Sequence, residues 1–446
     1  MFCWDEQSCQ QRFVMHDYWM SSQAKPWQST FAQGGIFATD GSSPWGAINR
    51  IYVKYCSSDL WSGDAPASSA TFGYQFRGSR IVSAVITSLV QKRGMGSVPG
   101  SRLLFGGCSA GAIGAMNNLD AVVDLVQPLG LQVQGFLDGA GLLDIQPRGW
   151  KWSPWLETLQ QLMANMTTFT QPVFPSYCAK HFPGKEWRCL LGQYRMPLIS
   201  SAPFFVNVPQ FDDFELMYDT DNYLPVSPSQ LSFVEEFQAG TLALIAALPP
   251  NTGVFAPTCL VHCLSGQTTF TQLTLEDGTS LESALSAWFF HGQPVQAVSP
   301  CIGWQCVQAC GVDMWTGLPC NLPRPGCSPI TALQPDPHGT TSSDTSTGGY
   351  HVNAVPATMK AEQQTVRADA QDLQVEEATP AGQEQDAEVA RLEEESITSE
   401  SEPPQQQQQG RRRLVGASQT AETSWQARAA ARMLAAQGPC CGNEAA

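Results

Sequence analysis

Apolar residues recur along the chain with the spacings of helices and of strands. Between residues 78 and 93 they stand three and four positions apart, at Ile81, Val82, Val85, Ile86, Leu89 and Val90. This spacing predicts an amphipathic helix, because residues three and four apart share one helical face. Helices are also predicted over residues 112–125 and 281–292.

Shorter apolar runs between these helices predict strands. Residues 50–56, RIYVKYC, alternate apolar and polar positions, which is typical of a half-buried strand. Further strands are predicted within residues 101–107, 133–140, 203–213 and 253–263. Because strands alternate with helices, the pattern predicts an α/β fold with a mostly parallel sheet flanked by helices.

The alternation ends near Cys327. Residues 331–446 are rich in Glu, Gln, Ser, Thr and Pro, and their 17 acidic and 8 basic residues give a net charge of −9. They hold too few large apolar residues to offset chain entropy. We therefore expect a globular domain over residues 1–330, followed by a disordered acidic tail in which only residues 424–437 favour a short helix.

The 446-residue chain carries a net charge of −16, which disfavours binding to nucleic acid or to an anionic membrane. No run approaches 18 consecutive apolar residues, so no transmembrane helix is expected. The first residues lack the basic and apolar regions of a signal peptide, whereas 15 cysteines suggest an oxidising compartment. We expect a secreted protein whose natural N-terminus lies upstream of Met1.

One motif indicates catalytic chemistry. Residues 107–111, GCSAG, fit the pattern G-x-S-x-G where a predicted strand meets a predicted helix. A nucleophile elbow holds its serine in a sharp strand-to-helix turn, so the neighbouring residues must be small. Ser109 would then be the nucleophile, and the backbone N–H of Ala110 would face the developing oxyanion. The alternative is a glycine-rich turn that serves only close packing.

A serine nucleophile needs a histidine base and a carboxylate that orients the histidine. The globular part has four histidines, His16, His181, His262 and His291. The order nucleophile, acid, base of α/β-hydrolases excludes His16. His262 is favoured because it follows a predicted strand and has cysteines on both sides, whereas His291 ends a helix. For His181 the intervening acids would be Asp120, Asp124, Asp138 and Asp144.

The acid that partners His262 is expected at the end of a strand between the serine and this histidine. Asp212 and Asp213 follow such a strand, and Asp219 lies further along. An aspartate in this place can equally cap the following helix.

Several segments resemble the pectin acetylesterase and Notum carboxylesterase family, over about residues 1–310. The resemblance rests on FCWDEQSC, INRIYVKYCSSDLWSGD, FRGSRI, GGCSAGAIG, FLDGAGLLD, CLVHC, AWFFHG and SPCIGWQCVQAC. It implies an α/β-hydrolase-like fold and a Ser-Asp-His triad, which falls on Ser109, Asp212 and His262. It thereby selects Asp212 over Asp213.

The chain departs from the family pattern near the expected oxyanion hole. The family has Gly-Gly-Gly before a Trp-Cys pair, and here Phe2 and Cys3 occupy the place of that pair. The glycines would therefore precede Met1. Loss of one oxyanion donor lowers turnover on the order of 100–1000-fold. The second glycine after the serine is replaced by Ala112, and NNLDAV after the elbow is closer to Notum than to the plant enzymes.

Thirteen of the 15 cysteines stand at or before Cys327. We expect Cys108, beside the nucleophile, to be a free thiol that packs as a small apolar residue, and the others to form up to six disulfides. The alternative is a zinc site built from Cys301, Cys306, Cys310, Cys320 and Cys327.

The sequence as a whole predicts a serine ester hydrolase that forms an acyl-enzyme and needs no cofactor or metal. The resemblance implies an O-acetylated polysaccharide as substrate, or else an acylated protein. The rival hypothesis is a catalytically impaired relative that binds glycans, with Trp150, Trp152 and Trp155 as a sugar-stacking lip.

Overall fold

The computed structural model describes residues 2–15, 17–22, 34–39, 41, 43–146, 159–220 and 227–310. The predicted tail over residues 331–446, with its short helix, lies outside these residues. So do His16 and the three tryptophans of the proposed sugar-stacking lip. The predictions made for them remain predictions.

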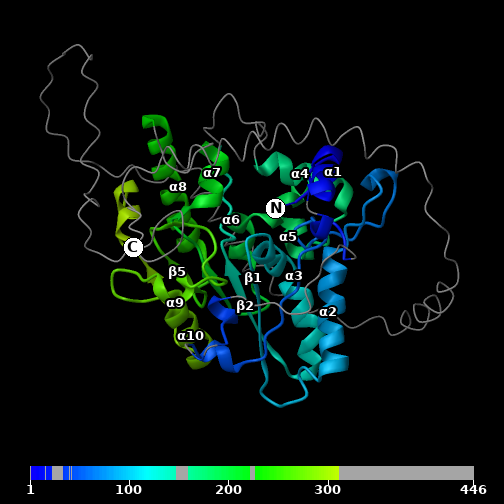
Figure 1. The fold of residues 1–446 in the computed structure, drawn as a ribbon, viewed down its shortest axis with the longest axis horizontal. Coiled ribbons are helices and arrows are strands. Elements are labelled where there is room, and N and C mark those ends of the chain that lie inside the picture. Colours follow the sequence, from blue (N-terminus) through cyan, green and yellow to red (C-terminus); the bar gives the residue numbers. More distant parts are fainter. Residues whose placement is uncertain are drawn as a thin grey trace, which may run out of the picture. The chain divides into compact units, whose positions relative to one another are not determined.

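Parallel strands form the central sheet (Figure 1). Their order across the sheet is β1 (Arg102–Cys108), β2 (Gln132–Asp138), β3 (Phe204–Asn207), β5 (Gly253–Ala256) and β7 (Gln296–Val298). A separate pair of short parallel strands joins β4 (Phe211–Asp212) to β6 (Leu260–Val261). The predicted α/β fold with a mostly parallel sheet is confirmed.

The α-helices surround this sheet. They are α1 (Glu6–Met15), α2 (Gly78–Arg93), α3 (Ala110–Val126), α4 (Leu159–Thr170), α5 (Ser176–His181), α6 (Gly192–Arg195), α7 (Asp213–Thr220), α8 (Pro228–Ala247), α9 (Thr269–Gln272) and α10 (Leu281–His291). The helices predicted over residues 78–93, 112–125 and 281–292 are thus confirmed as α2, α3 and α10.

Successive strand residues pack into two cores, one on each face of the sheet. Phe136, Phe205 and Phe255 pack with α9 and α10, whereas Leu137 and Val206 pack with α3 and α8. Neighbouring strand side chains point to opposite faces. Because both faces are covered by helices, these strands appear in the sequence as continuous apolar runs.

Two predicted strands are each interrupted by a proline. Residues 203–213 form β3 and then β4, with Pro209 in the gap, and residues 253–263 form β5 and then β6, with Pro257 in the gap. Proline lacks the N–H that a strand ladder needs. The short strands β4 and β6 therefore leave the central sheet together. β4 ends at the predicted acid, Asp212, and β6 ends one residue before the predicted base, His262.

The strand predicted over residues 50–56 is wrong. This segment joins no ladder within the described part of the chain. Ile51 and Val53, two of the alternating apolar residues, are 46% and 37% exposed, so the alternation does not mark a continuous buried face.

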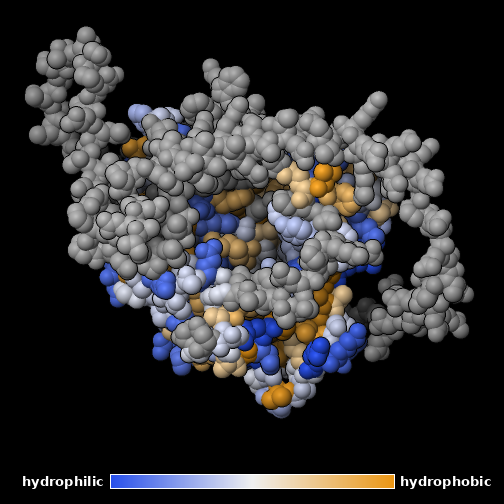
Figure 2. Space-filling view, in the orientation of Figure 1, coloured by the Kyte–Doolittle hydropathy of each residue, from blue (hydrophilic) through white to orange (hydrophobic). Residues whose placement is uncertain are grey.

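Hydrophobic and hydrophilic residues lie side by side near the centre of the face seen in Figure 1 (Figure 2). Among the described helices, none has the length and apolarity that crossing a bilayer requires.

Candidate active site

Ser109 occupies the sharp turn between β1 and α3. Its backbone adopts φ 56° and ψ −123°, a conformation that costs a non-glycine residue about 1–3 kcal/mol. The surrounding backbone holds it there, because the Ser109 N–H donates to the Asp138 carbonyl at 2.8 Å, and the Ser109 carbonyl accepts from Ala112 and Ile113. This is the geometry expected of a nucleophile elbow.

The two glycines of the motif differ in what they contribute. A Cβ on Gly107 would lie 2.5 Å from the backbone oxygen of Gly111, whereas a Cβ on Gly111 would meet nothing within 4 Å. The strand before the serine and the helix after it therefore pass so closely that only the first position requires glycine.

Asp212 and His262 form a direct hydrogen-bonded pair. The imidazole Nδ1 lies 2.9 and 2.7 Å from the two carboxylate oxygens of Asp212. Asp212 Oδ1 also accepts from the N–H groups of Phe214 and Glu215, at 3.0 and 3.1 Å. The same carboxylate thus caps α7 and holds the histidine, so the two roles considered for it are compatible.

The imidazole is held on its other sides as well. The Phe214 ring stacks on it, with centroids 5.1 Å apart and an interplanar angle of 28°. Its Nε2 atom is buried and makes no hydrogen bond within the described residues, so no such bond joins it to Ser109. Hydrogen bonds between catalytic groups are often long before substrate binds.

The pKa of His262 reflects opposing effects. Burial alone would lower it, but the Asp212 carboxylate raises it, both as a charge and as a hydrogen-bond acceptor, and Asp213 and Asp138 add to this. The net result is a pKa above the usual value of 6.5. The imidazole is therefore well placed to hold a proton once it has taken one.

Three other carboxyl groups, all on α7, have raised pKa values. Burial and the Asp212 charge raise the pKa of Asp213 to about 6 and that of Asp219 to about 8. The same two causes raise the pKa of Glu215 well above its usual range. Of the three candidate aspartates, Asp212 is the one whose carboxylate hydrogen-bonds His262.

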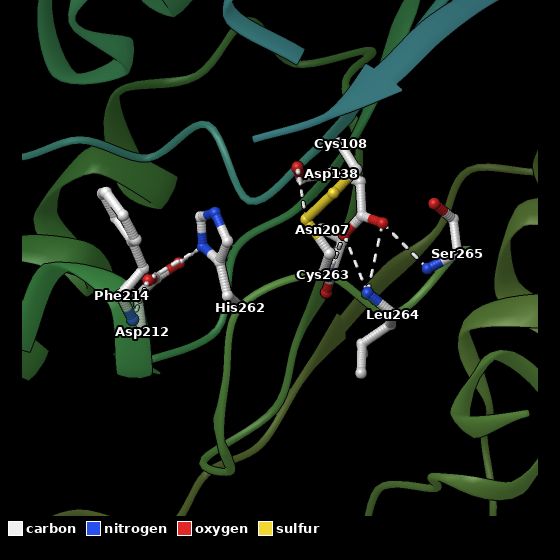
Figure 3. The surroundings of a disulfide bond; sticks show 9 residues. All are labelled: Cys108, Asp138, Asn207, Asp212, Phe214, His262, Cys263, Leu264 and Ser265. Carbon is white, nitrogen blue, oxygen red and sulfur yellow. Dashed lines mark hydrogen bonds and ion pairs between the residues drawn. A yellow bond between two sulfur atoms is a disulfide. The ribbon is translucent and has the colours of Figure 1, made fainter. Parts of the chain in front are cut away.

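A disulfide ties the elbow to the histidine loop (Figure 3). It joins Cys108, which precedes Ser109, to Cys263, which follows His262, with the two Cα atoms 5.8 Å apart. The prediction that Cys108 is a free thiol is therefore wrong. Its side chain is exposed at the end of an edge strand and meets a loop 155 residues away in the sequence, a pairing that local spacing does not reveal.

The other cysteines in the described part of the chain either form disulfides or are free thiols. Disulfides join Cys178 to Cys189 and Cys301 to Cys306, and Cys259 is also disulfide-bonded. The zinc alternative is contradicted for its first two ligands, Cys301 and Cys306, because their sulfurs are bonded to each other. The free thiols among the described residues are Cys3, Cys9 and Cys56.

Among the residues that the structure describes, two clusters bring possible metal ligands within 4.8 Å of one another. One contains Cys108, Asp138 and Cys263, but its two sulfurs are joined in the disulfide. The other contains Asp212, Asp213 and His262, where the imidazole Nδ1 is already engaged by Asp212. Asp212 and His262 therefore already form a hydrogen-bonded acid–base pair.

Two other histidine candidates lie at the ends of helices, whereas Ala110 directly follows Ser109. His181 ends α5 and packs edge-on against Phe182 at 4.6 Å between ring centroids, and His291 ends α10. Ala110 is the first residue of α3 and is buried. The structure thus joins Asp212 directly to His262, and it joins the neighbours of Ser109 and His262 through the disulfide.

Comparisons with known proteins find a family and several relatives that are similar to this chain. The model of the family described as Pectinacetylesterase matches residues 1–311. Palmitoleoyl-protein carboxylesterase NOTUM of Drosophila melanogaster is 31% identical over 294 residues, which cover 64% of this chain and 42% of that protein. Palmitoleoyl-protein carboxylesterase notum1a of Danio rerio is 29% identical over 346 residues, which cover 72% of this chain and 67% of that protein.

The chain is also similar to a solved structure of a Notum protein. The structure of the Wnt deacylase Notum from Drosophila superposes with a TM-score of 0.62 at 30% identity, and covers 69% of this chain and 87% of that one. The chain spans less than half the length of the curated Drosophila relative. The family match covers well over half of the chain, and the chain therefore belongs to the pectinacetylesterase family.

Proposed function

We propose that the protein is a serine carboxylic ester hydrolase whose triad is Ser109, Asp212 and His262. The observation that carries the proposal is the Asp212–His262 hydrogen bond of 2.7 Å, linked through a disulfide to a strained Ser109 turn. Family membership supports the same reaction class.

In this mechanism Ser109 Oγ attacks the ester carbonyl while His262 Nε2 takes its proton. Asp212 holds the imidazole through Nδ1 and stabilises the imidazolium that forms. The Ala110 N–H, at the start of α3, donates to the developing oxyanion. The imidazolium then protonates the departing alcohol, and a water deprotonated by His262 hydrolyses the acyl-enzyme to release a carboxylic acid.

Two substrate classes follow from the relatives. The family description points to O-acetyl groups on a polysaccharide, whereas the Drosophila and Danio relatives are named for removing palmitoleoyl groups from proteins. We propose the acetylated polysaccharide as substrate and treat the acylated protein as the second candidate, which the relatives' names favour. The Cys108–Cys263, Cys178–Cys189 and Cys301–Cys306 disulfides support residence in an oxidising, extracellular compartment.

Hydrolysis assays test both levels of the proposal. Purified protein is incubated with 4-nitrophenyl acetate, acetylated pectin and a palmitoleoylated peptide, with Ser109→Ala as the matched control. Release of acetate from pectin that is lost in Ser109→Ala supports the proposal. Release of palmitoleate alone would move the assignment to the second candidate. A folded wild type that hydrolyses none of the three, while binding acetylated pectin, would support the glycan-binding hypothesis instead.

A further inference from the structure

Asp138 lies between the serine turn and the histidine loop and has no role in the proposed mechanism. It is the last residue of β2, pairs in register with Cys108 of β1, and is fully buried. Figure 3 shows its carboxylate beside the disulfide, pointing toward Leu264 and Ser265.

The side chain of Asp138 is held by N–H donors. Its Oδ1 accepts from the Asn207 side-chain amide at 2.6 Å. Its Oδ2 accepts from the backbone N–H groups of Ser265 and Leu264, at 2.8 and 3.1 Å. A carboxylate is the acceptor that such a set of donors fits. Two of these donors directly follow His262 in the chain, separated from it only by Cys263.

The backbone of Asp138 bonds the turn that carries Ser109. Its carbonyl oxygen accepts from the Ser109 N–H at 2.8 Å. The next residue, Gly139, approaches the histidine so closely that a Cβ there would lie 3.0 Å from the His262 Nδ1. One residue thus bonds the serine turn through its backbone and the histidine loop through its side chain.

We propose that Asp138 is a positioning residue that fixes the loop carrying His262 against the turn carrying Ser109. The inference rests on the proposed function, since it assigns a task within that reaction. Buried partners that orient the ligands of metal sites commonly affect activity by about 10–100-fold, and we expect an effect of similar order here.

The charges that face His262 make this role measurable. They are Asp212 at the end of β4, Asp213 on α7 and Asp138 at the end of β2, and Phe214 covers the ring. Burial lowers the pKa of His262, and these carboxylates raise it in that order of size. Removing the Asp138 charge should therefore lower the pKa of the imidazole.

The test compares Asp138→Asn with Asp59→Asn. Asp59 is also fully buried and accepts backbone N–H bonds, from Trp61 at 3.0 Å and Gly78 at 2.8 Å. Neither of these hydrogen bonds involves the loop that carries His262. The His262 pKa is measured by NMR titration, and kcat and KM are measured across pH.

We expect Asp138→Asn to lower the His262 pKa by roughly half a pH unit or more, and to lower kcat by about tenfold or more with KM changed less than about twofold. Asp59→Asn should lower stability without moving the His262 pKa. An unchanged His262 pKa in Asp138→Asn, or an equal shift in Asp59→Asn, would overturn the proposal.

A second variant and the NMR titration keep the proposal testable if the first variant or the proposed function fails. If Asp138→Asn does not fold, Asn207→Ala removes one donor and keeps the charge. It should lower kcat several-fold without lowering the His262 pKa, and an unchanged kcat would overturn the proposal. The NMR titration needs no catalysis, so it tests Asp138 even if wild type hydrolyses no ester and the proposed function fails.

Discussion

Removal of the Cys108–Cys263 disulfide tests how the site is assembled. The double substitution Cys108→Ala and Cys263→Ala leaves no unpaired thiol at either position. It cuts the covalent link between the residue before Ser109 and the residue after His262. We expect two losses, one in the free energy of unfolding and one in turnover.

The sequence separation sets the size of the stability loss. In the chain-entropy description, a disulfide that closes 155 residues stabilises the fold by about 5 kcal/mol, and one that closes 11 residues by about 3 kcal/mol. The Cys178–Cys189 pair serves as the control, because it closes a shorter loop and lies outside the turn of Ser109 and the loop of His262. Turnover should also fall, because a displacement of about 1 Å between reacting groups can cost about 100-fold.

Urea denaturation and ester hydrolysis measure the two effects. The free energy of unfolding should fall by more in the Cys108/Cys263 variant than in Cys178→Ala with Cys189→Ala. At a temperature where both variants are folded, only the first should lose kcat. If the two pairs cost the same stability, or if kcat stays at the wild-type level without the first disulfide, the reasoning is refuted.

The remaining predictions concern the elbow, the acid, the base and a buried carboxylate. Gly107→Ala should lower the thermal midpoint sharply, because its Cβ would lie 2.5 Å from a backbone oxygen, whereas Gly111→Ala should leave the midpoint unchanged or raise it. Equal midpoints would contradict this. Asp212→Asn should lower kcat by about 10⁴-fold, as the loss of a triad acid does, and an ester assay with less than tenfold loss would exclude Asp212. The value of kcat/KM should rise with pH through a midpoint above 6.5, because the raised pKa of His262 keeps the imidazole protonated, and inactive as a base, to higher pH. A midpoint below 6 would contradict it. Between about pH 4 and pH 8 the folded state binds the Asp219 proton and the unfolded state releases it, since burial raises the folded pKa to about 8. Stability should therefore fall as pH rises through this range, and Asp219→Asn should raise the urea midpoint at pH 8 and reduce that slope.

Much of the fold could be predicted from local pattern. The helix over residues 78–93 matches α2 at both ends, because its apolar spacing, its preceding turn and Gly94 in the left-handed conformation all agree. The GCSAG motif could be placed at the start of a helix because a short apolar run precedes it and an apolar periodicity follows it. These signals lie within a few residues of one another.

The predictions that the structure contradicts depend on contacts between residues that lie far apart in the sequence. Residues 50–56 alternate like a strand, but a strand exists only where a partner pairs with it. The disulfide of Cys108 is not visible in the local sequence, because its partner, Cys263, lies 155 residues away. The role proposed for Asp138 escaped the sequence for the same reason, since its donors come from β3 and from the loop after β6.

The prediction of the acid shows where resemblance and structure each contribute. From the residues alone, Asp212, Asp213 and Asp219 are all candidates for the acid, because all three follow one strand. The resemblance pointed to Asp212, and its carboxylate is the one that hydrogen-bonds His262. The reason is geometric, since β4 and β6 pair in register and place Asp212 opposite Val261, next to the histidine.

Labelling with a fluorophosphonate measures most directly whether Ser109 is an activated nucleophile. The folded wild-type protein is treated with the probe, digested and mapped by mass spectrometry. We predict one adduct per molecule, on Ser109, and its loss in a folded His262→Ala variant. An adduct on another residue, or a folded wild-type protein that carries none, would contradict the assignment of Ser109, Asp212 and His262 as a catalytic triad.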